Sequence, residues 1–554
     1  MSDDILDVAR QWLGQDPDPQ TGDELRAVIA RAEAGDAAAV ADLHDRFDSR
    51  LAFGTAGLRG ALGAGSNRMN RVLVGQAAAG FAAYLRGRAG DATPSVVIGY
   101  DGRRNSDVFA RDSAEIFAGA GLRAILLPRL LPTPVLAFAV RHLGVSAGVM
   151  VTASHNPPDD NGYKVYLGGK DDGAQIVSPA DAEIAAHIDR VAAAADLASI
   201  PRSDDYETAG EEVVDAYVRA TALVAPAPAG AAGLNWVYTA MHGVGHETLA
   251  RILETAGYPA PTVVADQIAP DGRFPTVAFP NPEEPGAMDL AFETARVAGA
   301  ELILANDPDA DRLAVAIPDA AAPGGWRRLT GNEVGLLLGW RAARTATSGT
   351  LACSLVSSPG LQTIAEHYGL DFAATLTGFK WISRAPALVY GFEEALGYLV
   401  NPGTVRDKDG ISAAIAVLGL VAEAREEGRT LGDLLDESAA TFGHFASGQV
   451  SLRVDDVAVI GRIMGALRAA PPASVGAVAV DRIDDLLTAP EGSPRGDVLR
   501  VWLADGSRVI VRPSGTEPKL KAYLDVRGDS ADDAAVRLAA VEAGVREILA
   551  AAQT

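Results

Sequence analysis

Polar motifs follow apolar runs at three places along the chain. The apolar run 145–151 leads into residues 152–157, the run 300–305 into residues 306–312, and the run 387–391 into residues 392–394. Short apolar runs bounded by Gly, Pro and Asp are typical of buried strands. Because open α/β sheets bind ligands beyond the carboxyl ends of their strands, the pattern predicts three candidate binding loops.

Helical and strand-like patterns alternate through most of the chain. The first alternating stretch predicts strands at 96–100, 124–127 and 147–151 and helices at 108–118 and 135–143. Later stretches predict helices at 211–222, 247–256, 332–345 and 361–368, with strands at 236–240, 262–265 and 351–356. Such alternation favours an α/β fold of three similar domains with mixed, mainly parallel sheets.

The two ends of the chain have different patterns. Residues up to about 51 are helical in pattern, with a start signal at 21–24, and carry no catalytic motif. After helices at 411–426 and 431–438, the pattern predicts short strands at 449–454, 498–503, 507–511 and 521–526 and a final helix at 531–550. A turn at 504–506 between two strands indicates a hairpin, so we expect an antiparallel C-terminal α+β domain.

Composition restricts the partners. A chain of 554 residues is too long for one core, and its net charge of -24 would repel nucleic acid and anionic membranes. The acidic N-terminus and the lack of a long apolar run lead us to expect a cytoplasmic protein. The one cysteine, Cys353, lies in an apolar run and is expected to pack in the core.

Ser154 is the first chemical candidate. It follows the strand 147–151 and precedes a loop that we expect to continue to Lys164, so it is placed to act as a nucleophile or phosphate carrier, or merely to cap a turn. Residues 144–148 match the nucleophile elbow of α/β-hydrolases. That motif needs a strand before it and a helix after it, and here the order is reversed, so we reject it.

Three aspartates form the second candidate. Asp307, Asp309 and Asp311 bring three carboxylates close together, and these would resist being ionised at the same time unless a cation neutralised them. Hard oxygen ligands of this kind suit Mg²⁺. A calcium loop is rejected because Arg312 and Pro318 stand where it needs Gly and Glu. The alternative is an acidic, solvated turn.

Further loops offer groups for anions and hydroxyls. Arg59, in the glycine-rich stretch 53–60, could hold a phosphate with its guanidinium, and Glu393 and Glu394 could accept hydrogen bonds from sugar hydroxyls. Residues 512–516 offer a guanidinium, two hydroxyls and open backbone to one anion. Each stretch could instead be an ordinary turn or a helix start.

Four of these motifs occur together in a known order. Residues 152–157 with 161–164, 307–312, 392–398 and 512–516 resemble the signatures of the α-D-phosphohexomutases, the phosphoglucomutase and phosphomannomutase family. Residues 53–57, 378–381 and 393–398 resemble its long branch, which includes phosphopentomutases and glucose 1,6-bisphosphate synthase. Ala395 departs from the commonest pattern, which has serine there, so the choice of sugar stays open.

The resemblance implies four domains around a central cleft. They are a phosphoserine domain with N-terminal helices (1–205), a metal-binding domain (206–325), a sugar-binding domain (326–446) and a phosphate-binding domain (447–554). It also implies a Mg²⁺ ion held by Ser154, Asp307, Asp309 and Asp311, and a sugar 1,6-bisphosphate as activator. The expected partners are small-molecule sugar phosphates, and the protein would be a monomer or dimer.

The implied catalytic groups are Ser154, His155, Lys164, Arg59 and Arg312, with the general base either His155 or Lys164. The implied substrate-binding residues are Gly378, Lys380, Glu393, Glu394, Lys408, Arg512, Ser514, Gly515 and Thr516. The expected reaction interconverts hexose 1-phosphate and hexose 6-phosphate, with glucose placed before mannose. The alternatives are a phosphopentomutase and a sugar 1,6-bisphosphate synthase; the intact serine and aspartates argue against a non-catalytic sugar-phosphate binder.

Overall fold

The structure is a computed structural model that describes residues 2–90, 92–194, 196–454, 456, 458–490, 495–513 and 519–553. The chain forms two compact units. The first unit contains Met1–Leu329 and Gly397–Glu426, and the second contains Thr330–Leu396 and Glu427–Thr554. Within the described residues, we find no helix that is both long and apolar enough to cross a membrane.

The N-terminal pattern is helical, as predicted, and forms α1 (Ser2–Gln15), α2 (Pro19–Glu33) and α3 (Ala37–Phe47). The start predicted for α2 at 21–24 is wrong. The helix begins one turn earlier because the Asp18 carboxylate accepts a hydrogen bond from Gln20 N at 2.9 Å and Pro19 takes the first helical position. Thr21 is therefore buried inside the helix.

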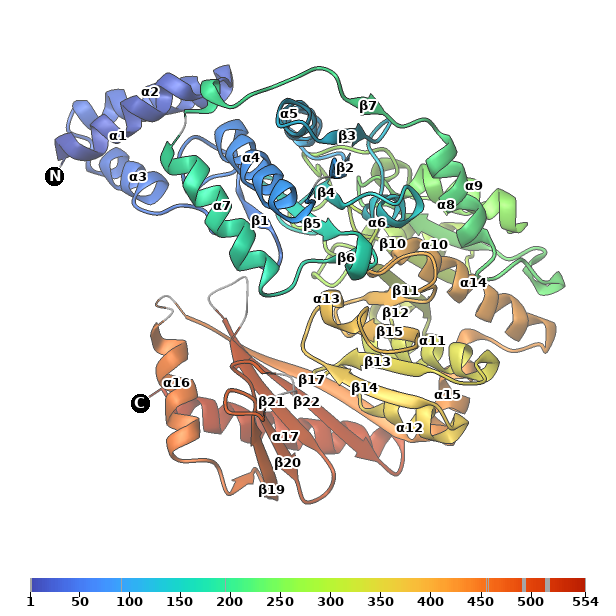
Figure 1. Ribbon diagram of the computed structural model, residues 1–554. Helices are drawn as coiled ribbons and strands as arrows, with labels where there is room; N and C mark the ends of the chain where they lie inside the picture. The colour runs from blue at the N-terminus through green and yellow to red at the C-terminus, as the bar shows by residue number, and fades with distance from the viewer. Residues whose placement is uncertain are drawn as a thin grey trace. The chain divides into compact units, whose positions relative to one another are not determined.

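The first sheet has the strand order β1-β5-β4-β2-β3-β7, with β6 paired to β5 (Figure 1). The strands β2, β3, β4 and β7 run parallel, and β1, β5 and β6 are antiparallel to their neighbours. The strands are β1 (Leu58–Ala61), β2 (Ser95–Tyr100), β3 (Arg123–Leu126), β4 (Ala147–Val151), β5 (Asp160–Leu167), β6 (Ala174–Gln175) and β7 (Glu207–Thr208). The helices are α4 (Arg71–Arg88), α5 (Ser106–Gly119), α6 (Thr133–His142) and α7 (Ala180–Ala194).

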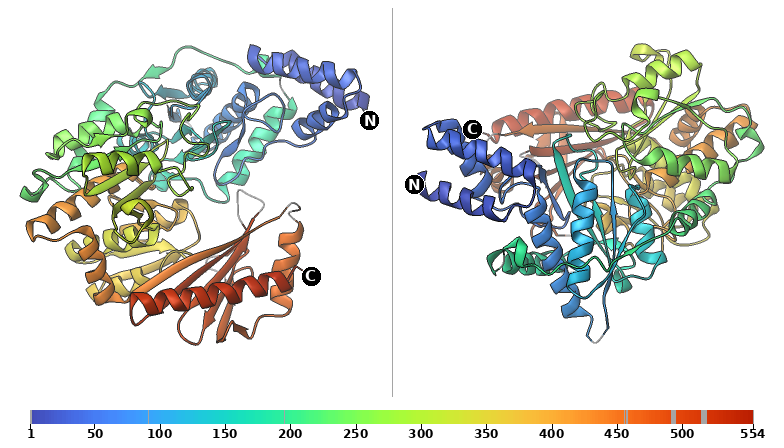
Figure 2. Two further views of the ribbon diagram at one scale, coloured as in Figure 1. Left: turned by 180° about the vertical axis from the view of Figure 1, so that it is seen from behind. Right: turned by 90° about the horizontal axis from the view of Figure 1, so that it is seen from above.

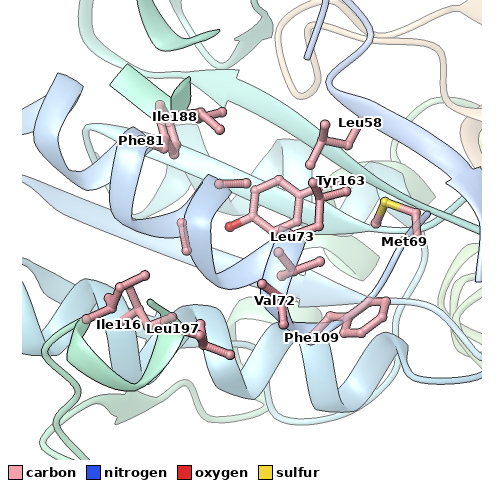
Figure 3. Close-up of a cluster of buried hydrophobic side chains, with 14 of the residues drawn as sticks. Leu58, Met69, Val72, Leu73, Phe81, Phe109, Ile116, Tyr163, Ile188 and Leu197 are labelled. Carbon is pink, nitrogen blue, oxygen red and sulfur yellow. The ribbon is translucent and has the colours of Figure 1, made fainter. Parts of the chain in front are cut away.

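Alternation along the strands separates the two faces of this sheet. Val96 and Ile98 face the core formed with α4, α5 and α7, whereas a Cβ on Gly148 would lie 2.4 Å from Val140 Cγ2 of α6. Tyr163 of β5 lies in the core beside Leu73 (Figure 3). The sheet is therefore covered on both sides.

The loop expected after Ser154 is shorter than predicted. Residues 160–164, expected to continue that loop, form the start of β5, which pairs with β4 so that Met150 lies opposite Lys164. Gly162 suggested a turn, but a Cβ there would lie 2.6 Å from Thr152 O and 2.9 Å from Leu58 O. The glycine permits close approach of neighbouring backbones, which is its other common role in strands.

The second sheet has the order β12-β11-β10-β8-β9 and mixes parallel and antiparallel pairs. Its strands are β8 (Trp236–Thr239), β9 (Thr262–Val263), β10 (Leu302–Asn306), β11 (Leu313–Pro318) and β12 (Trp326–Arg328). The helices of this part are α8 (Glu212–Ala222), α9 (Gly245–Ala256), α10 (Asp289–Ala298) and α14 (Gly410–Glu426); β16 (Gly397–Leu399) also belongs to the first unit. The segment β12 hydrogen-bonds to β11, although the sequence placed it at the start of the third domain.

The second unit begins with three parallel strands in the order β14-β13-β15. These are β13 (Thr350–Ser354), β14 (Asp371–Thr375) and β15 (Leu388–Glu393), with helices α11 (Gly331–Thr345), α12 (Gly360–Tyr368), α13 (Phe379–Ile382) and α15 (Leu431–Phe442). Cys353 is buried in β13, and burial raises the pKa of its thiol to about 12. Its predicted packing role is confirmed.

The last sheet is antiparallel throughout, as predicted, with the order β17-β22-β21-β20-β19-β18. Helix α17 lies along it (Figure 2). The predicted hairpin at 504–506 joins β20 to β21. The elements are β17 (His444–Arg453), α16 (Ala458–Ala469), β18 (Ser474–Val475), β19 (Val478–Asp485), β20 (Leu499–Leu503), β21 (Arg508–Pro513), β22 (Lys519–Gly528) and α17 (Ala531–Ala551).

The last domain contacts the three-stranded sheet of the same unit through side chains as well as through the chain connection. Leu355 and Val356, which follow β13, share an apolar cluster with Ile510 and Tyr523 of the last sheet. Arg508 adds a buried ionic link, because its Nε donates to Asp525 at 2.8 Å and its Nη2 donates to Ser357 O. The two parts of the second unit therefore share a packed interface.

Candidate active site around Ser154 and three buried aspartates

Ser154 lies just beyond β4, as predicted, and is almost fully buried. Its backbone is in the left-handed region, with φ of 54°, which costs about 1 kcal/mol or more for a residue other than Gly. Ser154 N donates to Thr152 Oγ1 at 2.8 Å, and Thr152 Oγ1 donates to Asp101 Oδ2 at 2.7 Å. These contacts hold the serine in a conformation that the isolated loop would avoid.

The three aspartates follow β10 and are fully buried. Ser154 Oγ donates to Asp307 Oδ2 at 2.7 Å, and Arg312 N donates to Asp307 Oδ1 at 3.0 Å. Thr133 Oγ1 donates to Asp309 Oδ2 at 2.7 Å. The structure thus brings together Ser154 and the acidic motif that stands about 150 residues later in the sequence.

Two lysines balance part of this negative charge. Lys164 Nζ lies 2.7 Å from Asp309 Oδ2 and 2.8 Å from Asp311 Oδ2, and Lys408 Nζ lies 3.0 Å from Asp311 Oδ2. Burial alone would lower the pKa of Lys164, but the charges of Asp309 and Asp311 outweigh it and raise that pKa. Among the described residues, no lysine pairs with Asp307, and burial and the other two aspartates raise its pKa well above the ordinary value.

The aspartates fit a divalent cation. One carboxylate oxygen from each of the three can be chosen so that all lie within 4.8 Å of one another. Among the described residues, Asp309 Oδ1 and Asp311 Oδ1 are buried and have no hydrogen-bond donor. Buried carboxylate oxygens without donors are costly unless a cation binds them, and Mg²⁺ prefers this kind of ligand.

Cationic and aromatic nitrogens surround the serine. Arg59 Nη1 donates to Asn156 Oδ1 at 3.0 Å, and His155 Nδ1 lies 3.3 Å from Ser154 Oγ. Burial, and then the charges of Arg312 and Arg59, lower the pKa of His155 well below its ordinary value. Arg312 Nη1 lies 4.0 Å from Glu283 Oε2. All five residues predicted as catalytic therefore lie in the first unit, around Ser154 and the acidic loop.

The remaining predicted residues, apart from Lys408, belong to the second unit. Glu394 Oε2 accepts hydrogen bonds from Ser354 Oγ and Ser357 Oγ, both at 3.0 Å, and Glu394 N donates to Ser357 Oγ at 3.0 Å. These serines, which the sequence analysis missed, occupy one Glu394 oxygen. Glu393 ends β15 and is half-buried.

The predicted anion-binding turn begins at the end of β21. Burial and then the charge of Glu394 raise the pKa of the Tyr523 hydroxyl, whereas the charge of Arg512 lowers it. Gly378, with φ of 107°, precedes α13, which contains Lys380. Ser514, Gly515 and Thr516 lie outside the described residues.

Comparison with known protein families identifies the family to which the fold belongs. Residues 50–195, 215–321 and 330–442 match the phosphoglucomutase/phosphomannomutase alpha/beta/alpha domains I, II and III, and residues 460–543 match the C-terminal domain of the same family. The chain belongs to the phosphoglucomutase/phosphomannomutase family. Its fold is therefore three α/β/α domains and a C-terminal domain, as the sequence predicted, and its activity is that of a phosphosugar mutase.

Individual relatives in this family carry different substrate names. The chain is 58% identical over 483 residues to a probable phosphomannomutase of Haemophilus influenzae, covering 87% of this chain and 98% of the relative. It is 34% identical over 579 residues to a phosphopentomutase of Mus musculus, covering 93% and 89%. A crystal structure of a putative phosphomannomutase from Thermus thermophilus has a TM-score of 0.68 at 24% identity, covering 90% of this chain and 99% of that one, and supports the fold.

Several residues of this mutase site were missed by sequence reasoning. Asp101 follows β2 as Ser154 follows β4, so the strand-end rule could have found it. Asp407 positions the neighbouring Lys408, because its Oδ2 accepts hydrogen bonds from Tyr166 Oη at 2.9 Å and Gln175 Nε2 at 2.7 Å. No local signal distinguishes Asp407 from an ordinary loop aspartate, since its partners lie more than 200 residues earlier.

Proposed function

We propose that this mutase interconverts hexose 1-phosphate and hexose 6-phosphate through phosphate carried on Ser154 and a sugar 1,6-bisphosphate intermediate. The observation that carries the proposal is the 2.7 Å hydrogen bond from Ser154 Oγ to Asp307 Oδ2 in a buried acidic cluster. A hydroxyl beside three carboxylates, two of which have a buried oxygen without a donor among the described residues, suits phosphoryl transfer assisted by a divalent cation.

Each step of the proposed reaction transfers one phosphoryl group between Ser154 and the sugar. The sugar hydroxyl oxygen forms a bond to phosphorus, the bond from phosphorus to Ser154 Oγ breaks, and the hydroxyl proton passes to a base while the serine oxygen regains a proton. The bisphosphate then turns over, and its other phosphate returns to Ser154. Asp307, Asp309, Asp311 and the serine oxygen would hold a Mg²⁺ ion, which would supply charge neutralisation for the transferring group.

The chain's own residues support this step in three ways. His155, 3.3 Å from Ser154 Oγ, and Lys164, fixed between two aspartates, are the groups proposed to exchange protons. Arg59 and Arg312 would steady the phosphoryl oxygens. Lys408, whose ammonium is held by Asp311, would contact the substrate from the same unit.

Sugar recognition is assigned to residues of the second unit. Glu393 and Glu394 would accept hydrogen bonds from sugar hydroxyls, with Glu394 oriented by Ser354 and Ser357. Gly378 and Lys380 would contact the same substrate. The phosphate that is not being transferred would be held by Arg512, Ser514, Gly515 and Thr516.

The choice of sugar is the part of the proposal that most needs a test. Hexose is favoured by the family match and by the relative named a probable phosphomannomutase. A pentose phosphate is the second candidate, because the phosphopentomutase of Mus musculus matches 93% of this chain and Ala395 removes the hydroxyl of the usual serine.

The test is kcat/KM for the 1-phosphates of glucose, mannose and ribose with Mg²⁺ and a sugar 1,6-bisphosphate present. We expect glucose 1-phosphate to give the highest value, followed by mannose 1-phosphate. A higher value for ribose 1-phosphate would replace the proposal with the pentose alternative. Net accumulation of sugar bisphosphate from another phosphoryl donor would identify a synthase instead.

A further inference from the structure

Arg103 occupies an unusual position behind the serine loop. Its side chain is almost fully buried, and its Nε lies 3.6 Å from Asp101 Oδ2. Among the described residues, it forms no hydrogen bond or ion pair with the three aspartates. Instead, its guanidinium donates to four backbone carbonyls. Arg103 Nη2 donates to Ser154 O and Asn156 O, both at 2.6 Å, and Arg103 Nη1 donates to Pro157 O at 2.8 Å and Asp160 O at 3.1 Å.

These four carbonyls span the whole loop from Ser154 to the first residue of β5. Each terminal nitrogen of the planar guanidinium carries two hydrogens, so one side chain can satisfy all four acceptors at fixed angles. Ser154 has the strained φ of 54°, and its own carbonyl is one of the four acceptors. The guanidinium therefore fixes the backbone on which the reactive hydroxyl is mounted.

A second contact ties Arg103 to the domain that carries the aspartates. The guanidinium carbon lies 4.8 Å from the centre of the Phe274 ring, and Phe274 is buried with φ of 47°. The chain before Phe274 packs closely on the residues around Arg103: a Cβ on Gly272 would lie 2.8 Å from Arg104 N, and a Cβ on Gly102 would lie 3.1 Å from Pro270 Cβ. Arg103 thus lies between the serine loop and the domain that contains the second sheet.

We propose that Arg103, stacked on Phe274, is a positioning residue that aligns the Ser154 loop with the acidic loop for phosphoryl transfer. This inference rests on the proposed role of Ser154 as phosphate carrier. Within the loop, the guanidinium hydrogen-bonds only to backbone carbonyls. By fixing this backbone, it determines the position of Ser154 Oγ relative to Asp307. It does so without contacting the substrate.

The chemistry of the side chain makes arginine necessary at this place. Lysine would keep the charge beside Asp101, but its ammonium has three donors and no planar fork, so at least one of the four carbonyls would lose its partner. The loop would then relax from the strained serine conformation. Misplacement of a reacting group by about 1 Å can lower a rate about 10²-fold.

The test compares Arg103→Lys with the parent enzyme, using glucose 1-phosphate, Mg²⁺ and glucose 1,6-bisphosphate. We expect kcat to fall about 10²-fold while KM for glucose 1-phosphate changes by no more than about twofold. Hydrogen exchange of the peptide that spans residues 153–160 should accelerate, which is a readout independent of activity. In Arg103→Ala, added guanidinium ions should restore part of the lost kcat.

Arg104→Lys is the matched control. Arg104 is the next residue, is partly exposed and pairs with Asp159 of the same loop, so its replacement should leave kcat within about twofold. Phe274→Leu keeps an apolar contact and removes only the aromatic face, so we expect a smaller loss of kcat in the same direction, which keeps the test open if Arg103→Lys folds poorly.

The outcomes separate this inference from the proposed function. If Ser154→Ala is inactive but Arg103→Lys and Phe274→Leu keep parental kcat and exchange rates, the positioning role is overturned and the phosphoserine proposal stands. If Ser154→Ala remains active, the proposed function fails and this inference fails with it. Loss of kcat that guanidinium does not restore, matched by an equal loss of folded protein, would leave Arg103 a purely structural residue and overturn the inference.

Discussion

The serine and aspartate region in the first unit and the sugar and phosphate region in the second unit are built in different ways. Ser154, Asp307 and Lys164 are buried, and each is held by partners from other strands or loops. Glu393 and Arg512 are only half-buried and stand at strand ends. We infer that the groups proposed for phosphoryl transfer are fixed within the fold, whereas the groups proposed for recognition are more accessible to a substrate.

This difference follows from what each region must do. Transfer between oxygen atoms depends on positioning and charge neutralisation, which a rigid, buried cluster supplies. In the proposed mechanism, recognition accepts the same sugar in two orientations, so less deeply buried side chains suit it. The comparison predicts that substitutions in the first region lower kcat and that substitutions in the second region mainly raise KM.

The largest effect is expected from Asp307→Asn. The change keeps the shape of the side chain but removes the charge beside Ser154 Oγ, so turnover with Mg²⁺ should fall by about 10³-fold or more, since metal catalysis contributes several kcal/mol. The melting temperature should stay close to that of the parent, because within the described part of the chain the lysines pair with Asp309 and Asp311 and not with Asp307. Steady-state kinetics across Mg²⁺ concentrations measures the effect.

The control for this prediction is Asp319→Asn, which lies at the far end of β11, outside the acidic loop, and is partly exposed. It should keep parental activity. Full turnover by the parent enzyme in excess chelator would contradict the proposal that the aspartates bind a cation needed for activity.

The sequence predicted the first region better than its surroundings, and the reasons are physical. Ser154 and the aspartates follow short apolar strands, and polar residues in that position are a local signal. Lys164 was placed in a loop because Gly162 looked like a turn residue, although it permits two backbones to approach each other. Arg103 was missed because its partners are carbonyl groups more than 50 residues later, which no side-chain pattern reveals.

In the second region, sequence reasoning named candidate loops but not the contacts inside them. Glu394 was predicted to face the sugar, but one of its oxygens accepts hydrogen bonds from Ser354, the last residue of β13, and from Ser357 in the loop after it. These serines also stand at a strand end, yet hydroxyl residues are common in turns and carry little information by themselves.

A smaller effect is expected from Arg512→Ala, which tests the second region. Loss of one charge-assisted hydrogen bond should weaken the binding of monophosphate and bisphosphate alike, by about 1.5 to 3 kcal/mol. The measurements are KM for the hexose 1-phosphate and the concentration of sugar 1,6-bisphosphate needed for activation. Phosphate on Ser154 should persist in this variant.

Arg500→Ala serves as the control in the same sheet, because Arg500 pairs with Asp484 and lies outside the predicted anion-binding turn. It should leave both affinities unchanged. If Arg512→Ala also kept parental affinities and lowered kcat instead, the division of labour between the two regions would be wrong.

The smallest effect concerns a buried carboxyl of the first unit that lacks a cationic partner. Burial raises the pKa of Asp409 to about 6, although its carboxylate accepts hydrogen bonds from Tyr217 Oη, Ile411 N and Ser412 N. Because the folded state holds this proton more tightly than the unfolded chain, the stabilisation is complete below about pH 4 and is lost as the pH rises through about 6.

Asp409→Asn removes this titration. As the pH rises from 5 to 7, the free energy of unfolding of the variant relative to that of the parent should increase by about 1 kcal/mol. Melting temperatures of both proteins across this range measure the difference. A difference that does not change with pH would show that Asp409 is ionised throughout, like the aspartates that lysines balance.

The most direct test of the account is the location of phosphate during turnover. The enzyme is incubated with glucose 1,6-bisphosphate and Mg²⁺, digested and mapped by mass spectrometry, and then mixed with hexose 1-phosphate before a second mapping. The account predicts one phosphate on Ser154 that passes to the sugar in the second step. Turnover with no phosphate on Ser154, or parental kcat in Ser154→Ala, would contradict it.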